Sequence, residues 1–580
     1  MGILRFNKRR SFRCLFFALF LFLNGIGHAA TIDAESCSLS DVQTATTSAS
    51  SGDTVVIPAG SSIWTSTLTI PDSKKITIKG AGYDNTVITN GYIVMGTSGS
   101  RITGIGFILP ATTFINVQGI GWRIDHCKFY YVGGTGILVR SIHANGYNTA
   151  LSLTGLIDNN IFINTSIAVN GQGTFETQSG IWAEASVLGT QSAVYVEDNI
   201  FSRTDGENYN CMDGNRGART VFRYNTLLNT GHEVHSLQDD GTRSYRSWEI
   251  YGNTFTANIY AFRPMFIRGG TGIVFDNTVS GAKWSFKSIT TDNNRTYNSV
   301  GVSGRCNGSS TWDGNLTIDN IPLYGDIGTG THTGGNSEAV LTDSTKNWTA
   351  DSMVYSSSVR PGATIYNITD GSSCVITANT ATQVMCTLTS GTNNIWNSGD
   401  QYRITDGYPC RDQIGRGTDA NLFDKLSLPY PPQNSSPVYL WANWITENST
   451  ILPFTVSNGF NYQFKSDRDY YQYVSNFNGS SGTGCGTLVA RPATCTVGTA
   501  YWATNQSCSD LTGMVGANPT TPISGTLYKC TAPNTWTAYY TPYIYPHPLR
   551  SISNKGVTII NTVGGLNAID MVGGLNVINQ

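Results

Sequence analysis

The chain has 580 residues and a formal net charge of −2, and only 13% of its residues are charged. A single compact core rarely serves a chain of this length, so several domains or an elongated solenoid are expected. The near-neutral charge offers no bulk field that would attract nucleic acid or an anionic membrane. The 63 Gly and 29 Tyr residues favour β-structure with many turns over helices.

The first 30 residues have the pattern of a secretory signal. A basic stretch spans residues 8–13, an apolar stretch spans 14–26, and small residues at 27–30 offer a cleavage site. The apolar stretch is too short for a comfortable transmembrane span, and no later segment is long enough. We therefore expect a secreted or cell-surface protein with a signal peptide at residues 1–30.

A pattern of apolar residue, two variable residues, Asn, any residue and apolar residue then recurs. It occurs at residues 157–162, 196–201, 222–227, 250–255, 274–279 and, much later, 440–445. Residues 102–107 and 124–129 fit with Ile105 and Cys127 in the Asn position.

The spacing of the Asn position predicts stacked coils. From residue 105 to residue 277 the successive steps are 22, 33, 39, 26, 28 and 24 residues. The shortest steps match one turn of a β-helix, and longer steps add a loop to it. The apolar neighbours would point inward, and the Asn side chains would stack in a hydrogen-bonded ladder at a tight turn, each in a left-handed backbone conformation. A β-propeller or a β-sandwich is the alternative, but propeller repeats are longer.

The cysteines fit an exported protein. Eleven of the twelve lie beyond the signal segment. Cys374 and Cys386 are close enough in sequence to pair, and a second group could form two bridges; that group is Cys485, Cys495, Cys508 and Cys530. Cys306 and Cys410 flank an apparent insertion and could join its base, and Cys127 is expected to be a buried thiol.

The chain resembles the pectate-lyase-like superfamily of right-handed parallel β-helices. Residues 51–60 and 76–82 look like the first coils of such proteins, and Trp122-Arg-Ile-Asp-His126 is similar to a motif of pectate lyases with Arg123 added. The resemblance also implies a short capping helix, expected at residues 39–49, that covers the open end of the core. The resemblance covers residues 35–300 and resumes at 437–471. It implies the fold, whereas the fold itself hosts lyases, hydrolases, adhesins and tailspikes.

The predicted organisation has six parts. The signal peptide at 1–30 is followed by a parallel β-helix at 31–330, a small inserted β-domain at 335–405 and a β-helix continuation at 406–483. A Cys-rich, disulfide-stapled loop module spans 484–540, and a C-terminal segment at 541–580 carries a repeated Val-Gly-Gly-Leu-Asn. That repeat could pair with another chain and allow self-association.

Charged residues concentrate between Arg203 and Arg268, on coils with long connecting loops. Loops on neighbouring coils build one groove wall, where functional residues usually lie. By contrast, the outward residues Asp125, Asp158, Glu197 and Arg223 are expected to be a solvated column or surface ion pairs.

Lyase cleavage of a uronate glycan needs three groups: a cation that neutralises the carboxylate, a base and an acid. Related enzymes use Arg or Ca²⁺ for the first task, and the resemblance implies an extracellular polysaccharide as partner. The candidate catalytic residues are His235, Arg246, Arg268, Arg243, Arg263 and His232. The candidate Ca²⁺ ligands are Asp205, Glu207, Asp213, Asp239 and Asp240.

Two other functions stay open. The acid pair Asp239-Asp240 is similar to that of polygalacturonase-like hydrolases, although a turn explains it as well. The third reading is a noncatalytic adhesin or glycan-binding solenoid. The sequence therefore favours a polysaccharide lyase without excluding a hydrolase or a binding protein.

Overall fold

The computed structural model describes most of the chain beyond the signal segment. The described residues are 29–96, 99–109, 114–133, 138–146, 153–171, 186–235, 243–291, 317–318, 321–322, 329–351, 353–354, 363–405, 412–416, 435–456, 464 and 466–551. Residues 1–28 of the expected signal peptide, Cys306, Cys410 and the repeats of the tail lie outside these ranges. No helix among the described residues is long and apolar enough to cross a membrane.

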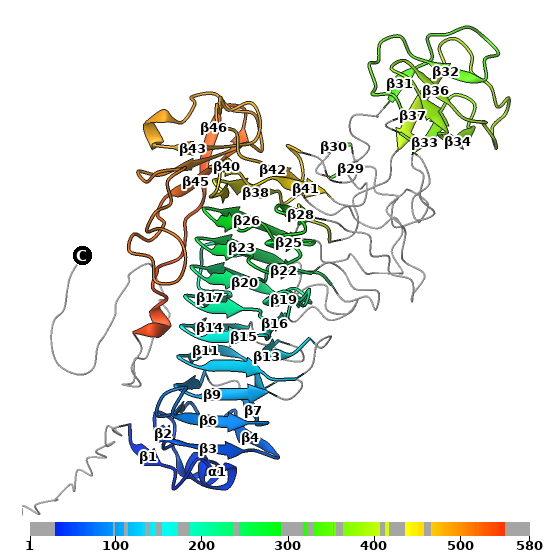
Figure 1. The fold of residues 1–580 in the computed structure, drawn as a ribbon. Coiled ribbons are helices and arrows are strands. Elements are labelled where there is room, and N and C mark those ends of the chain that lie inside the picture. The colour runs from blue at the N-terminus through cyan, green and yellow to red at the C-terminus, as the bar shows by residue number, and fades with distance from the viewer. Residues whose placement is uncertain are drawn as a thin grey trace, which may run out of the picture.

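Three long sheets run along the molecule (Figure 1), and strands that follow one another along the chain pass from sheet A to sheet B to sheet C. Sheet A contains β1 (Thr31–Asp33), β2 (Thr54–Val56), β5 (Thr77–Lys79), β8 (Arg101–Thr103), β11 (Ile120–Asp125), β14 (Thr154–Asp158), β17 (Val194–Glu197), β20 (Arg219–Arg223), β23 (Ser247–Tyr251), β26 (Thr271–Phe275), β38 (Val438–Trp441) and β42 (Tyr470–Tyr471).

Sheets B and C repeat the same order. Sheet B contains β3 (Gly60–Ile63), β6 (Thr86–Thr89), β9 (Gly106–Leu109), β12 (Lys128–Tyr131), β15 (Ile161–Ile163), β18 (Ile200–Ser202), β21 (Thr226–Leu228), β24 (Thr254–Thr256), β27 (Thr278–Ser280), β39 (Trp444–Ile445) and β40 (Thr450–Ile451). Sheet C contains β4 (Thr67–Ile70), β7 (Tyr92–Met95), β10 (Ile115–Val117), β13 (Arg140–Asn145), β16 (Ser166–Asn170), β19 (Met212–Asn215), β22 (His232–Val234), β25 (Met265–Ile267), β28 (Ile289–Thr291) and β41 (Phe454–Val456).

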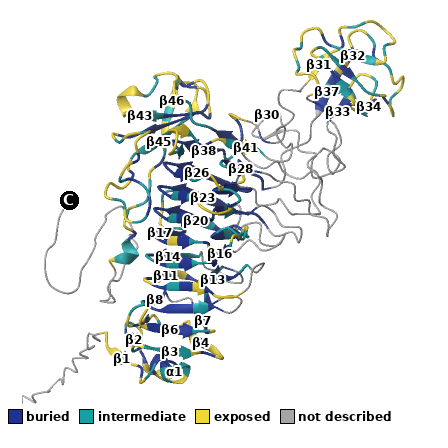
Figure 2. Cartoon of the chain, viewed as in Figure 1, coloured by how far each residue is buried: buried dark blue, intermediate teal, exposed yellow. Residues whose placement is uncertain are grey.

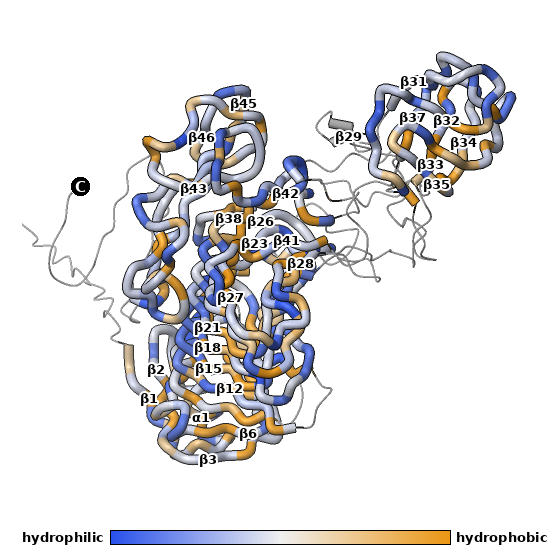
Figure 3. Tube along the Cα trace, turned by 45° about the horizontal axis from the view of Figure 1, so that its top comes forward, coloured by the Kyte–Doolittle hydropathy of each residue, from blue (hydrophilic) through white to orange (hydrophobic). Residues whose placement is uncertain are grey.

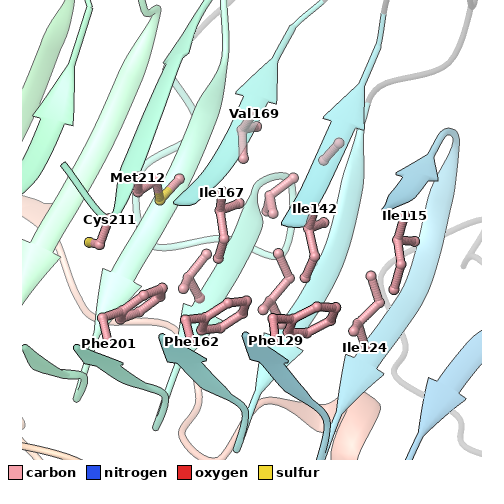
Figure 4. Close-up of a cluster of buried hydrophobic side chains, with 14 of the residues drawn as sticks. Ile115, Ile124, Phe129, Ile142, Phe162, Ile167, Val169, Phe201, Cys211 and Met212 are labelled. Carbon is pink, nitrogen blue, oxygen red and sulfur yellow. The ribbon is translucent and has the colours of Figure 1, made fainter. Parts of the chain in front are cut away.

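Strands from successive turns pair in parallel, as β11 does with β14 and β14 with β17. This is the right-handed parallel β-helix that the sequence predicts. The core lies between the three sheets, and buried and apolar residues recur along the stack (Figures 2 and 3). Phe129, Phe162 and Phe201 stack with ring centroids 5.0 and 4.6 Å apart, beside a column of Ile115, Ile142, Ile167 and Met212 (Figure 4).

The predicted Asn ladder is confirmed at the corner between sheets A and B. Each side-chain amide donates to the Oδ1 of the next Asn, at 3.0 Å from Asn160 to Asn199 and at 2.8 Å from Asn277 to Asn443. The members between them, Asn225 and Asn253, make the same bond at 3.0 Å. Buried amides are thereby satisfied from Asn160 to Asn443.

One detail of the expected turn is wrong. The left-handed residue is the one before the Asn, as Asp198 (φ 58°) and Tyr224 (φ 54°) show. The Asn side chain must point inward to reach the ladder, so the reversal of the chain falls one residue earlier.

The helix α1 (Leu39–Ser48) covers the N-terminal end of the core, as expected. It buries Val42 and Ala45, and the Ser38 hydroxyl at its start accepts from the Asp41 amide at 3.3 Å. This cap satisfies one of the amides that a helix start leaves unpaired.

Antiparallel strands occupy the region of the predicted insertion. One sheet contains β31 (Thr329–Thr331), β33 (Thr364–Asn367), β34 (Ser373–Val375) and β37 (Gln401–Thr405); another contains β32 (Val340–Thr342), β35 (Ala378–Asn379) and β36 (Gln383–Met385). They share a core of their own around Ile365, Trp396 and Tyr402, and Cys374 pairs with Cys386. A short hairpin, β29 (Thr317–Ile318) and β30 (Ile321–Pro322), precedes them, and the solenoid resumes when β38 pairs with β26.

The C-terminal cover, which we define as residues 483–551, lies on the outer face of sheet A. Its elements are β43 (Thr483–Gly486), η3 (Leu488–Ala490), β44 (Ala500–Ala503), β45 (Thr526–Ala532), β46 (Thr535–Tyr540) and η4 (Pro548–Arg550). Disulfides join Cys485 to Cys508 and Cys495 to Cys530, as the sequence suggests. Trp502 packs against Phe275 and Trp441 of sheet A, with ring centroids 5.1 and 5.2 Å away.

The expectation of a solvated column on sheet A is wrong. All four residues are buried: Asp125 lies against Arg101 and Arg123, and the C-terminal cover contacts Asp158, Glu197 and Arg223. Arg223 Nε donates to Glu197 at 2.7 Å and its other nitrogens donate to the carbonyls of Tyr543 and Ile544, at 2.7 and 2.9 Å. A segment more than 300 residues away thus turns surface positions into an internal ion-pair ladder.

Candidate active site

Polar side chains follow the outer face of sheet C, from β13 to β25. Side chains alternate between faces along each strand, and residues in register form columns across the strands. His143, Ala168 and Asp213 stand in one column, and Glu233 and Phe266 continue it. The long connections at 147–152, 172–185 and 236–242 follow strands of this sheet in the sequence. Sheet C is therefore the face on which a site is expected.

Asp213, Glu233 and His235 form a cluster on β19 and β22. One ligand atom from each lies within 4.8 Å of the others. The amide of Asn210 donates to Glu233 Oε2 at 2.7 Å, and Arg268 forms an ion pair with Glu233 Oε1. Two carboxylates, an imidazole and a guanidinium are thus brought together from three adjacent coils.

The two carboxyl groups have different pKa values. Burial and the nearby charge of Glu233 raise the pKa of Asp213 to about 7, against the influence of Arg268 and Arg140. Burial also acts to raise the pKa of Glu233, but Arg268, His235 and the Asn210 amide outweigh it and hold that pKa below its usual value. Near neutral pH the pair can therefore hold one proton on Asp213 while Glu233 stays ionised.

A second column runs beside the cluster. It consists of Asn145, Asn170 and Asn215 in register, and His235 and Arg268 take the next two positions along the register of β22 and β25. The Asn170 amide lies 2.8 Å from His143 Nε2. This column offers amides on one side of the cluster and a cation on the other.

Arg268 and Arg263 also frame an aromatic ring. The guanidinium carbons lie 4.4 and 3.3 Å from the ring centroid of Phe266, and Arg263 donates to Thr290 Oγ1 at 3.0 Å. Of the predicted catalytic residues, His235 and Arg268 belong to the cluster, and Arg263 borders it.

The other three candidates lie elsewhere. His232 points into the core between Met212 and Met265, and burial lowers its pKa to about 3. Arg243 is fully buried and pairs with Asp412 through two bonds of 2.7 and 2.8 Å. Arg246 is buried, and burial together with Arg219 lowers its pKa to about 10. These surroundings suit structural roles.

Of the predicted Ca²⁺ ligands, Asp213 belongs to the cluster. Asp205 instead pairs with Arg203 at 2.7 Å and accepts from the Glu207 amide at 3.1 Å, so neither acid joins it. Asp239 and Asp240 lie outside the described residues.

The sequence reasoning missed Glu233, which lies between two histidines that it did consider. The period of two along a strand could have found it, because residues 233 and 235 face one way and residue 232 faces the other.

A divalent cation fits the cluster. The two carboxylates supply the oxygen ligands that Ca²⁺ prefers, and a cation would stabilise the ionised form of Asp213, which burial and the charge of Glu233 disfavour. The imidazole nitrogen of His235 is a ligand that transition metals also accept. Asp213 and Glu233 are the residues that would hold the ion.

The strand register defines the class of the molecule: a right-handed parallel β-helix. Neither a protein-family model nor a curated protein matches the sequence. Among solved structures, an alginate lyase from Paenibacillus sp. FPU-7 is 18% identical, with a TM-score of 0.23 over 44% of this chain and 94% of that one. The ORF18 protein of Geobacillus virus E2 is 12% identical, with a TM-score of 0.22 over 63% and 77%. A PL6 family alginate lyase, AlyGC, is 11% identical, with a TM-score of 0.14 over 46% and 54%.

Proposed function

We propose that this protein cleaves a uronate-containing polysaccharide by β-elimination on the outer face of sheet C. One observation carries the proposal: Asp213, Glu233, His235 and Arg268 converge there, with the pKa of Asp213 near 7. A cation, a base and a proton donor are the three groups that elimination from a uronate requires.

The roles follow from the charges. Arg268, held in place by Glu233, faces the uronate carboxylate and stabilises the negative charge that develops when the α-proton leaves. His235 takes that proton, and the electron pair forms the new C4–C5 double bond as the C4–O bond breaks. Asp213 protonates the departing oxygen, which its raised pKa allows near neutral pH. Where a divalent cation is bound, Asp213 and Glu233 would hold it in their ionised forms; the cation would then help to neutralise the uronate carboxylate, and Asp213 would not serve as the proton donor.

The test is incubation of the purified protein with a panel of uronate polysaccharides. Elimination creates a conjugated double bond that absorbs in the ultraviolet. We expect this absorbance to rise with wild-type protein and to rise about a hundredfold more slowly with His235→Gln or Arg268→Ala. The matched control is Lys128→Ala, which removes a cation from the outer face of sheet B, where Lys128 pairs with exposed Asp84. Full turnover by both site variants would refute the assignment.

A hydrolase is the second candidate, and the carboxylate pair favours it. Glycosidases use two acids a few ångströms apart, of which the one with the raised pKa donates a proton and the ionised one acts as nucleophile. Asp213 and Glu233 have this arrangement. Hydrolysis releases reducing ends without ultraviolet absorbance, so the same panel separates the two reactions. Binding without any product would point to an adhesin or another glycan-binding protein.

We also propose that the protein acts outside the cell or at its surface. The signal pattern at residues 1–30 supports export, and so do the three disulfides among the described residues. An exported chain is expected to begin after residue 30 by terminal sequencing. Recovery of the intact N-terminus inside the cell would contradict it.

A further inference from the structure

The coils that precede the cluster carry a second group of charged and polar side chains. On the outer face of sheet C, Ala168 stands between His143 and Asp213 and contributes only a methyl group. His143 and Asp213 are two strands apart, a separation of roughly 10 Å. The mechanism proposed above uses none of the side chains on the His143 side.

Two guanidinium groups act on this region. Burial, together with the positive charges of Arg140 and Arg216, lowers the pKa of His143 to about 4. Arg140 also acts on Asp213, so it lies within reach of both ends of the column. The imidazole is therefore neutral at physiological pH, and the charges of both arginines act on it.

Two buried polar atoms on this face of sheet C have capacity for a ligand. Arg140 Nε is buried and has no hydrogen-bond partner among the described residues, and the same is true of Asn215 Oδ1. Buried polar atoms normally have partners, so atoms of this kind point to a group that is bound there. Asn145 and Asn170 extend the row of amides, which suit the hydroxyl groups of a sugar ring.

We infer that Arg140 and Arg216 form a carboxylate-binding subsite that selects a uronate unit next to the one that reacts. The amides of Asn145, Asn170 and Asn215 bind the ring hydroxyls of that unit, and neutral His143 fixes the Asn170 amide at 2.8 Å. The inference rests on the proposed function, because it assumes that a glycan lies across sheet C. It adds that selectivity for acidic sugars comes from the coils of β13 and β19 as well as from the cluster.

The test compares binding of a uronate oligosaccharide with binding of its carboxyl-reduced, neutral counterpart, by calorimetry. In wild-type protein the acidic ligand is expected to bind more tightly. Arg140→Gln and Arg216→Gln should each weaken binding of the acidic ligand about tenfold and leave binding of the neutral one unchanged. Where turnover is measurable, KM should rise by a similar factor while kcat stays within about twofold.

Two further variants separate a subsite from a structural role. Arg140→Lys keeps a positive charge and should retain much of the selectivity, which a purely structural arginine would not predict. Lys128→Gln on sheet B should change neither affinity. Thermal unfolding of each variant reports whether the solenoid is intact.

The outcomes are distinct for the two proposals. Wild-type affinity of Arg140→Gln and Arg216→Gln for the acidic ligand would overturn the subsite, while ultraviolet-absorbing product from the wild type would still uphold the reaction. Binding that depends on both arginines without any product would uphold the subsite and overturn the reaction. Absence of binding to any uronate oligosaccharide by the wild-type protein would overturn the subsite.

Discussion

The outer faces of sheets A and C both carry charged residues in register, yet the two faces use them differently. On sheet A, each carboxylate of the ladder has a cation beside it and the C-terminal cover excludes water. On sheet C, two carboxylates are neighbours: burial and the charge of Glu233 raise the pKa of Asp213, whereas Arg268 holds the pKa of Glu233 down. Paired and covered charge stabilises a solenoid, whereas like charges held together mark a site where chemistry is expected.

The largest loss of stability is expected from a substitution of Arg223 on sheet A. Its side chain is fully buried against Glu197, the Tyr251 hydroxyl and the C-terminal cover. Arg223→Ala leaves a buried carboxylate without its main partner, so the free energy of unfolding should fall by about 3–5 kcal/mol in a denaturant titration. Lys128→Ala is the control and should change it by less than about 0.5 kcal/mol. A loss below about 1 kcal/mol would show that the ladder is not the anchor of the cover.

The corner between sheets A and B provides the next test. Asn225→Ala removes the acceptor of Asn199 and the donor to Asn253, inside the buried ladder. We expect the free energy of unfolding to fall by about 2–3 kcal/mol, because buried polar groups lose their partners. Asn159→Gly changes a half-buried residue with φ of 54°, a conformation that Gly adopts readily, and should cost less. Equal losses would mean that the ladder contributes no more than an ordinary turn.

Glu249 is a buried acid beneath the C-terminal cover, and its ionisation is expected to lower the stability of the folded protein. It accepts from the Gly189 amide and the Tyr540 hydroxyl, and burial raises its pKa to about 7. A raised pKa means that the folded protein prefers the protonated acid, so wild-type stability falls as pH rises from about 4.5 to 7. Glu249→Gln should therefore unfold like the wild type at pH 4.5 and be about 1–3 kcal/mol more stable at pH 8.

The control for this prediction has the opposite sign. Glu447 is half-exposed. Burial acts to raise its pKa, but Lys287 and hydrogen bonds outweigh burial and lower the pKa below its usual value. Glu447→Gln should thus lose a little stability at pH 8 and none at low pH. A Glu249→Gln variant whose stability follows the wild type at both pH values would show that the acid is not held in its neutral form.

The smallest effect is expected from a substitution of Asp205, which tests where the site on sheet C ends. Asp205 pairs with Arg203, outside the cluster of Asp213, Glu233 and His235. Asp205→Asn should change the initial rate on the uronate panel by no more than about twofold, because a group that touches no reacting atom affects the barrier little. A hundredfold loss would extend the site to the connection between β18 and β19.

The sequence predicted the architecture because the signal is local to each coil: an Asn with apolar residues three before and two after it. The disulfides at Cys374–Cys386 and in the C-terminal cover were accessible for the same reason, since their partners lie within 35 residues of each other. The fate of Arg223 was not accessible, because its partner carbonyl at Tyr543 is 320 residues away. Arg243 likewise looked like a site residue because Asp412, which neutralises it, lies 169 residues further on.

The site was only half predictable. His235 and Arg268 stand out as charged residues on a coil with long loops, but which of His232 and Glu233 faces outward depends on the strand register. Arg140 and His143 escaped notice because the preceding coils hold few charges, and their importance appears only when β13 and β16 are laid beside β19.

The solenoid resumes in register after its long interruption. Val274 of β26 pairs with Leu440 of β38, and Asn277 donates to Asn443, although 166 residues separate the two amides. The coil before the interruption is therefore joined to the coil after it by strand pairing and by a side-chain amide hydrogen bond, independently of the length of chain between them. Such a joint lets evolution splice whole domains into the molecule, or an engineer exchange them, without rewriting the coils on either side.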